Sequence, residues 1–357
     1  MTSRLPAEWE PQSAVWLTWP HEAGDWGDGL DAVHACFLDL AQAIAAAQPA
    51  LICACNAAWA DKIAQDLQAR QVDAGRIRIH IHASNDVWTR DYGALSVVDA
   101  DGAGRLVDFR FNGWGGKFRA DLDDALAAAL RRAGWFADTP FLSLPWIVEG
   151  GALDTDGQGT LLVRESAVRT ETRNPGLDRA DLEAIWREHL GVTRVHWLRH
   201  GHLQGDDTDG HIDTLARFCD PGTIAYQACD DPRDPHYAPL RAMAEELADL
   251  RTPDGQAYAL IPLPMPQACF DAGLRLPAGY ANFLILNGRV LLPIYACPQD
   301  IEAQIRLAAV LPPRKIHNDT STKAEKIDKM RYSRRIKTMA PRWICSPISR
   351  TRPSASG

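Results

Sequence analysis

Three segments of the sequence carry dense polar chemistry between stretches that look structural. They are residues 85–93 with Asp91, residues 145–151 with Glu149, and residues 200–213 with His211 and Asp213. Polar clusters that follow strands are common positions for binding and catalytic residues. His211 and Asp213 are two residues apart, so on a strand they would point into one cavity. The clusters also have purely structural explanations: a local Arg90–Asp91 ion pair, a glycine bulge with a solvated acid, and a loop of surface histidines.

Metal binding is one chemistry that the third segment could support. Asp207 and Asp209 before Gly210 resemble part of a calcium loop. If Gly210 is the sixth position, the first and twelfth positions are Gly205 and Ala216, where the loop needs acids, so calcium is excluded. Four side chains could instead ligate zinc: His200, His202, His211 and Asp213. Because no His-Glu-x-x-His helix or other zinc spacing is present, zinc is kept only as an alternative.

The elements that must position these residues alternate between helices and strands. The hydrophobic pattern predicts helices over residues 30–48, 61–70, 121–132, 178–190, 239–250 and 300–310. It predicts strands over residues 15–19, 51–55, 77–82, 224–227 and 258–262, and hairpins at Asp101-Gly102, Asp156-Gly157 and Asn287-Gly288. Residues 1–310 contain no Gly-, Ser- or Pro-rich linker, which predicts one α/β domain of repeated strand–helix units. Neither a Gly-x-Gly-x-x-Gly fingerprint nor a phosphate loop is present, which argues against a nucleotide-binding fold.

The charge of the chain is unevenly distributed. Its 357 residues are 46% hydrophobic and include 38 Lys and Arg against 46 Asp and Glu. From Arg314 onward there are 12 basic and 3 acidic residues, which leaves 26 basic and 43 acidic residues before it. Such an acidic body disfavours nucleic acid as a partner and favours a cationic small ligand.

The sequence also predicts a cytoplasmic protein. Residues 1–6 lack the apolar core of a secretory signal. The longest uncharged run, residues 40–60, is interrupted by polar residues and Pro49, so no membrane span is expected. Eight cysteines are scattered without a Cys-x-x-Cys pair, which fits buried thiols in a reducing compartment.

The three segments, in this order, resemble the agmatine deiminases and their relatives among the bacterial peptidyl-arginine deiminases. The resemblance runs from Pro6-Ala7-Glu8-Trp9-Glu10-Pro11 to about Tyr295. The motifs that carry it include Trp88-Thr89-Arg90-Asp91, Phe111-Asn112-Gly113-Trp114-Gly115-Gly116-Lys117, Glu149-Gly150-Gly151, Asn174-Pro175-Gly176, Gly210-His211-Ile212-Asp213 and Gly279-Tyr280-Ala281-Asn282-Phe283. One such motif means little, whereas this many in one order is specific.

The resemblance implies both a fold and a reaction. The fold is a five-bladed pseudo-symmetric α/β propeller, which agrees with repeated strand–helix units. The reaction is hydrolysis of a guanidinium to a ureido group and ammonia, with no metal and no organic cofactor. A cysteine thiolate attacks the central carbon and forms an amidino-cysteine intermediate.

The resemblance also assigns roles to individual residues. The implied substrate-binding residues are Asp91, Trp88 and Trp114, and the implied catalytic residues are His211, Asp213 and Glu149. Asp91 and Asp213 would grip the planar guanidinium, whose forked donors suit carboxylates. His211 would act as the general acid and base, oriented by Glu149. Trp88 would stack on the guanidinium plane.

The resemblance breaks at the C-terminus. The family's nucleophile lies in a loop of approximately Gly-x-x-His-Cys followed by an apolar residue and Thr or Ser, but no glycine occurs between Gly288 and Gly357. Cys345 is the only cysteine of the tail and is therefore the candidate nucleophile. Its neighbours do not match, because Ile344 stands where His is expected and Pro347 would interrupt a strand.

Two explanations account for the basic tail, residues 311–357. A frameshift or reading-frame error near residue 310 would replace the family's terminal strand with unselected, disordered sequence and leave the propeller incompletely closed. Alternatively, the tail is a genuine basic arm that touches RNA or anionic lipid. The abrupt change to basic, Ser- and Thr-rich sequence favours the first explanation, under which residues 1–310 are the catalytic domain.

The leading functional prediction is an agmatine deiminase that makes N-carbamoylputrescine on a route to putrescine, with impaired catalysis in this chain. Deimination of arginine in peptides, non-catalytic binding of guanidinium or polyamine ligands, and a zinc hydrolase are the alternatives. The expected partner is a small cationic guanidino compound, without nucleic acid or a membrane, and a homodimer is one candidate assembly.

Overall fold

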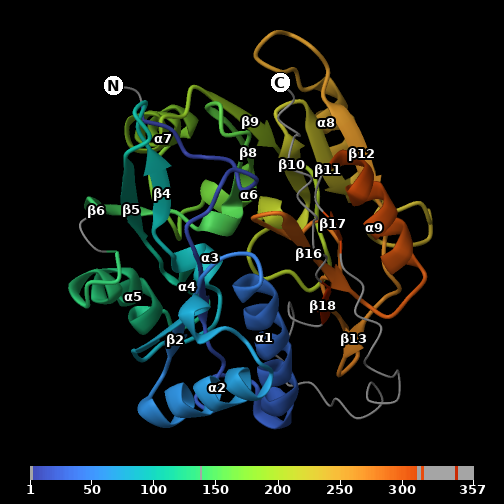
Figure 1. Ribbon diagram of the computed structural model, residues 1–357. Helices are drawn as coiled ribbons and strands as arrows, with labels where there is room; N and C mark the ends of the chain where they lie inside the picture. Colours follow the sequence, from blue (N-terminus) through green and yellow to red (C-terminus); the bar gives the residue numbers. More distant parts are fainter. Residues whose placement is uncertain (1–2, 137–138, 312–314, 317–341, 345–357) are drawn as a thin grey trace, which may run out of the picture.

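The computed structural model describes residues 3–136, 139–311, 315–316 and 342–344. They form five small β-sheets and one separate two-stranded hairpin, with helices between the strands (Figure 1). The α/β class predicted from the sequence is therefore confirmed. No sheet closes on itself among the described strands. None of the described helices is long and apolar enough to cross a membrane.

Four of the sheets share one topology. In each, an antiparallel hairpin is followed by a helix and by a third strand that runs parallel to the second hairpin strand. The strands are β4 (Leu95–Val98), β5 (Gly104–Arg110) and β6 (Phe141–Ile147); β7 (Leu153–Thr155), β8 (Thr160–Arg164) and β9 (Arg194–Leu198); β10 (Ala216–Asp220), β11 (Thr223–Gln227) and β12 (Ala259–Leu263); and β15 (Leu284–Leu286), β16 (Arg289–Ile294) and β17 (Lys315–Ile316). The helices between the second and third strands are α5 (Asp121–Arg132), α7 (Arg179–Leu190), α8 (Tyr237–Asp249) and α9 (Gln299–Val310).

The first sheet departs from this pattern because its three strands are all parallel. β1 (Val15–Thr18) pairs with β2 (Ala50–Ala54), which pairs with β3 (Ile77–Ile81). Helices α1 (Leu30–Ala45) and α2 (Ala57–Ala69) make the two crossovers. β1 therefore lies at one edge of its sheet, and no antiparallel strand covers that edge in the described part of the chain.

The remaining elements are short. They are α3 (Thr89–Tyr92), α4 (Gly113–Gly116), α6 (Glu165–Val168), the 3-10 turns η1 (Gly27–Gly29), η2 (Ala74–Arg76), η3 (Gly150–Ala152) and η4 (Ile212–Thr214), the hairpin of β13 (Phe270–Asp271) and β14 (Leu274–Arg275), and β18 (Arg342–Ile344), which pairs antiparallel with β16. Several of these short elements, rather than the long helices, position the polar segments described below.

Local capping explains where the long helices begin. The Asn56 side chain accepts the backbone N–H of Trp59, so α2 starts four residues before the predicted start at Asp61. Asp178 and Asp181 form a reciprocal capping box at the start of α7. In α5 the acids lie in the first turn and the arginines in the last, which complements the helix dipole.

Apolar packing joins each sheet to its helices. Ile52 of β2 packs with Phe37 and Ile44 of α1, and all three side chains are almost fully buried. Leu161 of β8 packs likewise with Trp186 of α7. Burial of each such side chain contributes about 1.5–3 kcal/mol, so these contacts fix the frame on which the polar segments are mounted. Figure 1 shows α2, α5, α8 and α9 on the outside of the molecule.

One buried arginine links segments that are far apart in the sequence. Arg217 of β10 pairs through Nε with Asp154 of β7 at 2.6 Å and through Nη2 with Glu8 at 3.0 Å. Its Nη1 also donates to the backbone oxygen of Phe283 at 3.0 Å. The Ile285 N–H donates to the other Glu8 oxygen at 2.7 Å. The N-terminal segment is thus joined to three different sheets by one charge network.

We predict that Arg217→Met destabilises the fold strongly. The substitution leaves Glu8 and Asp154 buried without their cation, and breaking a buried pair costs about 3–5 kcal/mol. Urea denaturation followed by circular dichroism measures the loss. Arg241→Met is the matched control, since Arg241 lies on the exposed side of α8 and should show no measurable change. Equal effects in the two variants would contradict the buried network.

Candidate active site

The polar segments meet because each directly precedes the first strand of a hairpin. Asp91 lies on α3 before β4, Glu149 precedes η3 and β7, and His211 and Asp213 flank the start of η4 before β10. The exposed fractions of these four side chains are small: 7% for Asp91, 1% for Glu149, 2% for His211 and 5% for Asp213. His211 and Asp213 line one cavity, as expected, but not from a strand: Asp213 lies in the 3-10 turn η4 and His211 directly precedes it.

Gly151 shows how closely three of these groups converge. A Cβ atom built on Gly151 would lie 2.6 Å from Asp91 Oδ1, 2.6 Å from His211 Nδ1 and 2.9 Å from Asp213 Oδ2. The three atoms therefore surround a single point, and any side chain at position 151 would collide with them. Because glycine has no side chain, Gly151 permits this close approach.

His211 is held between two acids. Its Nε2 lies 2.6 Å from Glu149 Oε2, and its Nδ1 lies 3.4 Å from Asp91 Oδ1. Burial disfavours the charged imidazolium, but Asp91, Glu149 and Asp213 together raise the pKa of His211 to about 9. At neutral pH this histidine therefore carries a proton that it could transfer.

Glu149 is itself fixed by a buried arginine. Arg173 binds both Glu149 oxygens, at 2.9 Å through Nε and 3.0 Å through Nη2. Its third nitrogen, Nη1, lies 2.8 Å from Asp209, which also pairs with Lys117 at 2.7 Å. Burial would raise the pKa of Glu149, yet His211 and Arg173 hold it below its usual value. Glu149 is therefore an anion with a fixed orientation.

Asp91 is oriented by two hydrogen bonds. The Gly151 N–H donates to Oδ1 at 2.9 Å, and Trp114 Nε1 donates to Oδ2 at 3.0 Å. Trp114 has φ of 57°, a left-handed conformation that costs energy for a bulky residue. Burial raises the pKa of Asp91, partly offset by the nearby His211. The predicted contact of Trp114 with substrate is thus accompanied by a role in orienting Asp91.

Asp213 is the least satisfied of the acids. Its Oδ1 is buried and has no hydrogen-bond partner among the described residues. Its Oδ2 lies 3.7 Å from Nε of Arg90. Burial raises the pKa of Asp213 to about 6, against the opposing effect of His211 and Arg90. An incoming cation could satisfy both the free oxygen and the charge.

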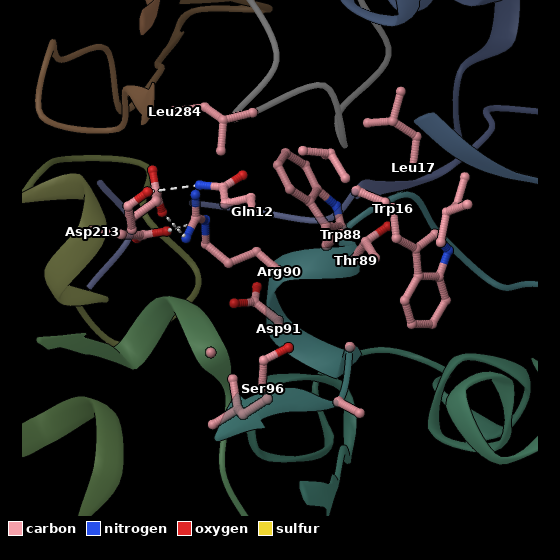
Figure 2. A pocket seen from close by; sticks show the side chains of 18 of the residues that line it. Gln12, Trp16, Leu17, Trp88, Thr89, Arg90, Asp91, Ser96, Asp213 and Leu284 are labelled. Carbon is pink, nitrogen blue, oxygen red and sulfur yellow. Dashed lines mark hydrogen bonds and ion pairs between the residues drawn. The ribbon is translucent and has the colours of Figure 1, made fainter. Parts of the chain in front are cut away.

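Arg90 does not close this gap because another acid holds its guanidinium. Arg90 Nη1 donates to Glu8 Oε2 at 2.9 Å, the same oxygen that accepts from Arg217. Burial opposes ionisation of Glu8, but Arg217 and Arg90 lower its pKa to about 2. Figure 2 shows Arg90 and Asp91 extending from α3 toward Asp213. Arg90 therefore pairs with Glu8 instead of with its neighbour Asp91, the partner considered from the sequence.

A cavity of about 1560 Å³ opens onto these groups. Asp91, His211 and Asp213 line it together with Trp88 and Trp114, so the structure brings most of the predicted site residues to one place. Glu149 lies behind His211, where it contacts the histidine at 2.6 Å. The predicted stacking face of Trp88 borders the cavity beside Trp16 and Thr89 (Figure 2).

No cysteine lines the cavity within the described residues. Burial raises the pKa values of Cys53 and Cys219 to about 12, so neither is an activated thiol. Cys345, the predicted nucleophile, lies outside the described residues. The part of the cavity that the structure describes thus has acids and an acid–base group but lacks a thiol.

Metal binding finds no support in the described ranges. They contain no group of three or more His, Cys, Asp or Glu side chains arranged to hold a metal ion. Of the four candidate zinc ligands, His200 and His202 are exposed, whereas His211 and Asp213 are buried at the cavity.

Sequence reasoning missed Arg173, Glu8 and Arg90 as parts of the site. Arg173 directly precedes the Asn174-Pro175-Gly176 motif, and Glu8 and Arg90 lie inside motifs that carry the resemblance. Their positions beside or within these motifs could have identified them as candidates. No periodic pattern marks a buried arginine. Together the described groups could bind a planar cation and transfer a proton to or from it.

The chain is similar to proteins of one deiminase family in both sequence and structure. A family model described as Porphyromonas-type peptidyl-arginine deiminase matches residues 4–323. The agmatine deiminase of Stutzerimonas stutzeri is 36% identical over 332 residues, covering 86% of this chain and 88% of the relative. That of Pseudomonas aeruginosa strain LESB58 is 33% identical, covering 88% of this chain and 89% of the relative. A solved cysteine-to-serine variant of C. jejuni agmatine deiminase with substrate bound is 32% identical, has a TM-score of 0.80, and covers 88% of this chain and 89% of that one.

The raised pKa of His211 predicts a stability that depends on pH. Because the pKa rises from 6.5 to about 9 on folding, its contribution is fully present below pH 6.5 and is lost as the pH rises through 9. The free energy of unfolding should fall by up to about 3 kcal/mol over this range. Urea denaturation at successive pH values measures this slope. His211→Gln should remove most of the slope, whereas His200→Gln, at an exposed position, should keep it; an unchanged slope in His211→Gln would contradict the assignment.

Proposed function

Because the chain belongs to the Porphyromonas-type peptidyl-arginine deiminase family, we propose that its cavity binds agmatine by the guanidinium group and that its reaction class is hydrolysis of agmatine to N-carbamoylputrescine and ammonia. The match confirms the resemblance predicted from the motifs. The names of the relatives support agmatine as the substrate. We propose that the product, N-carbamoylputrescine, is a precursor of putrescine.

The observation that carries this proposal is the convergence of Asp91, His211 and Asp213 on one point beside Gly151. A guanidinium is planar and permanently charged, with donors along its edges. Asp91 and Asp213 would accept those donors, and the cation would lower the cost of keeping both carboxylates ionised. Trp88 would cover one face of the plane.

The proton chemistry falls to His211. In the proposed reaction a thiolate adds to the guanidinium carbon, the carbon–nitrogen bond breaks, and His211 gives its proton to the departing ammonia. A water molecule then cleaves the carbon–sulfur bond, with His211 accepting a proton, and the ureido product and the thiol are released. Glu149, fixed by Arg173, would keep the imidazole oriented in both steps.

A non-catalytic guanidinium binder is the second candidate, favoured by the lack of a cysteine along the described cavity. The C. jejuni relative was solved with substrate bound after a cysteine was replaced by serine. By analogy, we propose that this chain binds agmatine without a thiol and that turnover needs one from elsewhere. Cys345 is the candidate within the chain. Deimination of peptidyl arginine is a further alternative, supported by the description of the family model.

The repeated topology supports a larger arrangement. We propose that the five sheets are the blades of a five-bladed pseudo-symmetric propeller that lacks one strand. Residues 1–310 are proposed as the catalytic domain and residues 311–357 as an atypical tail that replaces the family's C-terminus. A cytoplasmic location, a homodimer and the absence of nucleic-acid partners are kept as proposals that the sequence suggests.

Replacing either acid should weaken agmatine binding strongly. In Asp91→Asn and Asp213→Asn the carboxylate that pairs with the guanidinium is lost, which costs about 2–5 kcal/mol and weakens binding by about 30-fold or more. Isothermal titration calorimetry with agmatine measures this change. Both variants should stay folded, since burial already disfavours these charges. Asp249→Asn, at an exposed position, is the control, and unchanged affinity in either site variant would refute the assignment.

Agmatine binding should also weaken in acid. Burial raises the pKa of Asp213 to about 6 in the empty site, so this carboxyl becomes neutral as the pH falls through that value. A neutral acid cannot pair with the cation. The affinity should therefore fall about tenfold for each pH unit below 6, until the pH reaches the lower pKa that Asp213 has in the agmatine-bound protein. Calorimetric titrations between pH 5 and pH 8 test this. Affinity independent of pH would exclude Asp213 from the binding site.

A further inference from the structure

The loop of residues 206–210 leads directly into His211 and is anchored by cations from other parts of the chain. Three consecutive backbone oxygens of this loop each accept a hydrogen bond from a different cation: Asp207 O from Lys117 Nζ at 2.7 Å, Thr208 O from Arg173 Nη2 at 3.2 Å, and Asp209 O from Arg164 Nη1 at 2.7 Å. Hydrogen bonds with a charged donor are about twice as strong as neutral ones. The loop that precedes His211 is therefore fixed at three successive positions.

The loop needs such anchors because its backbone is strained. Asp209 has φ of 68°, a left-handed conformation that a residue with a side chain rarely adopts. Asp206 holds the loop from within, where Oδ1 accepts the Thr208 N–H at 3.1 Å and Oδ2 accepts the Gly210 N–H at 2.6 Å. A strained residue relaxes when the contacts around it are lost, so removal of an anchor should change the position of Asp209.

The position of the loop reaches His211 by two routes. Through the backbone, the His211 N–H donates to Thr208 Oγ1 at 3.0 Å. Through side chains, Asp209 Oδ2 accepts from Arg173 Nη1 at 2.8 Å, and Arg173 holds both oxygens of Glu149. Glu149 in turn lies 2.6 Å from the Nε2 atom of His211. A shift of Asp209 is therefore transmitted to the imidazole.

Lys117 is the anchor that joins the backbone of the loop to the side chain of Asp209. Its Nζ donates to Asp207 O and lies 2.7 Å from Asp209 Oδ1, whereas Arg173 binds the other oxygen, Oδ2. The Lys117 side chain is 37% exposed, against 2% for Arg173. Because Arg173 still pairs with Asp209 when Lys117 is replaced, a substitution at Lys117 can loosen the loop without leaving this acid unpaired.

The lysine follows α4, which also contacts the inner part of the site. Trp114 of α4 donates to Asp91 at 3.0 Å. Asn112, which caps α4, donates to the Thr172 oxygen at 2.7 Å, and a Cβ atom built on Gly115 would lie 2.6 Å from Thr172 Oγ1. α4 is thus bonded to an acid of the site and packed against the residue that precedes the buried arginine. The lysine therefore extends from a backbone whose position relative to the site is fixed.

We propose that Lys117 is a positioning residue for His211 and that it acts through Asp209. Lys117 holds the loop in the conformation in which Asp209 orients Arg173, and Arg173 in turn fixes Glu149 against the imidazole. The use of this imidazole as a proton donor rests on the proposed function, whereas its positioning does not. An isolated ion pair at the surface would have little effect, but this one is the outer end of a buried network.

The pKa of His211 measures this positioning in the full-length chain. Protein with ¹³C-labelled histidine is titrated by NMR, and the signal of His211 is identified by its loss in His211→Gln. The acids that face the imidazole are Glu149, Asp91 and Asp213, and all three are kept in every variant used. A change in this pKa therefore reports a change in how these acids are held or balanced.

Lys117→Met should raise the pKa of His211 by about 0.5. Without Lys117, the negative charge of Asp209 acts more strongly on Arg173, and the hold of Arg173 on Glu149 weakens. Glu149 then stabilises the charged imidazolium more than before. Lys117→Arg keeps the charge and the donors, so it should restore the original pKa. An unchanged pKa in Lys117→Met would overturn the proposal.

An Asp209→Asn background shows whether Lys117 acts through Asp209. If it does, Lys117→Met should leave the pKa of His211 unchanged in that background, because the carboxylate that transmits the effect is gone. A shift of the same size in both backgrounds would mean that the charge of Lys117 acts directly on the imidazole. That result would also overturn the proposal.

A second lysine–aspartate pair provides the matched control. Lys62 lies 2.9 Å from Asp66, which also bonds to a buried histidine at 2.8 Å. The two side chains are 50% and 34% exposed, close to the 37% and 35% of the first pair. The bonds of this second pair lead to Trp19 and not to the acids of the site. Lys62→Met should therefore leave the pKa of His211 unchanged, and a shift equal to that of the first lysine would contradict the proposed route.

The backbone amide of His211 gives a second reading that needs no variant of Asp209. Because its N–H donates to Thr208 Oγ1, it should exchange with solvent only when the loop opens. We expect exchange at least about threefold faster in Lys117→Met than in Lys62→Met, and equal rates would overturn the proposal. Urea denaturation shows whether the variants stay folded. A lower urea midpoint with an unchanged pKa of His211 would mean a structural role alone, which also overturns the proposal.

Agmatine calorimetry on the unsubstituted chain separates this inference from the proposed function. If the pKa of His211 responds to Lys117 through Asp209 and agmatine does not bind, the positioning stands and the proposed function fails. If agmatine binds and the pKa of His211 does not respond to Lys117, the guanidinium site stands and the positioning is wrong.

Discussion

The cost of burying a carboxylate organises the centre of this protein. Asp91, Glu149, Asp213 and Glu8 are all removed from bulk water, and an unpaired buried charge is far more expensive than a paired one. Two of them are fully compensated by arginines, Glu149 by Arg173 and Glu8 by Arg217 and Arg90. Asp91 and Asp213 are not, and they face the cavity. The arginines therefore pair with Glu149 and Glu8, and Asp91 and Asp213 are the acids left for the guanidinium in the proposed function.

This distribution gives the site its rigidity as well as its charge. Each compensated acid is held by more than one hydrogen bond, and each arginine is anchored by a second contact, as Arg173 is by Asp209. Asp209, like Trp114, adopts a left-handed backbone conformation, with φ of 68°. Unfavourable conformations of this kind persist only where surrounding contacts determine them. Trp114 contacts Asp91 directly, and Asp209 is linked to Glu149 through Arg173, so the surrounding fold maintains the geometry before any ligand arrives.

Much of the frame could be predicted from the sequence because it depends on apolar periodicity and turn chemistry. The helix at residues 121–132 and the hairpin at Asn287-Gly288 are present as predicted. β9 and β10 were missed, and β10 shows the reason: Arg217 is the second residue of a buried strand, where a charged residue breaks the hydrophobic pattern. The site residues within short motifs were found as candidates by their types. Their partners, such as Arg173 for Glu149, could not be found, since no rule of spacing relates residues 24 positions apart that meet only after folding.

The N-terminal segment has a consequence for how the chain reaches its folded state. Glu8 pairs with Arg217, and Gln12 accepts and donates hydrogen bonds at Asn287 and Ile285, so residues made early find partners made more than 200 residues later. Contacts of such long sequence separation slow folding, because a large loop must close before they form. During synthesis the first strand would emerge long before the segments that complete its surroundings, and its apolar residues would stay exposed to other chains. The order of synthesis thus leaves β1 accessible to other chains while the segments that complete its surroundings are still being made.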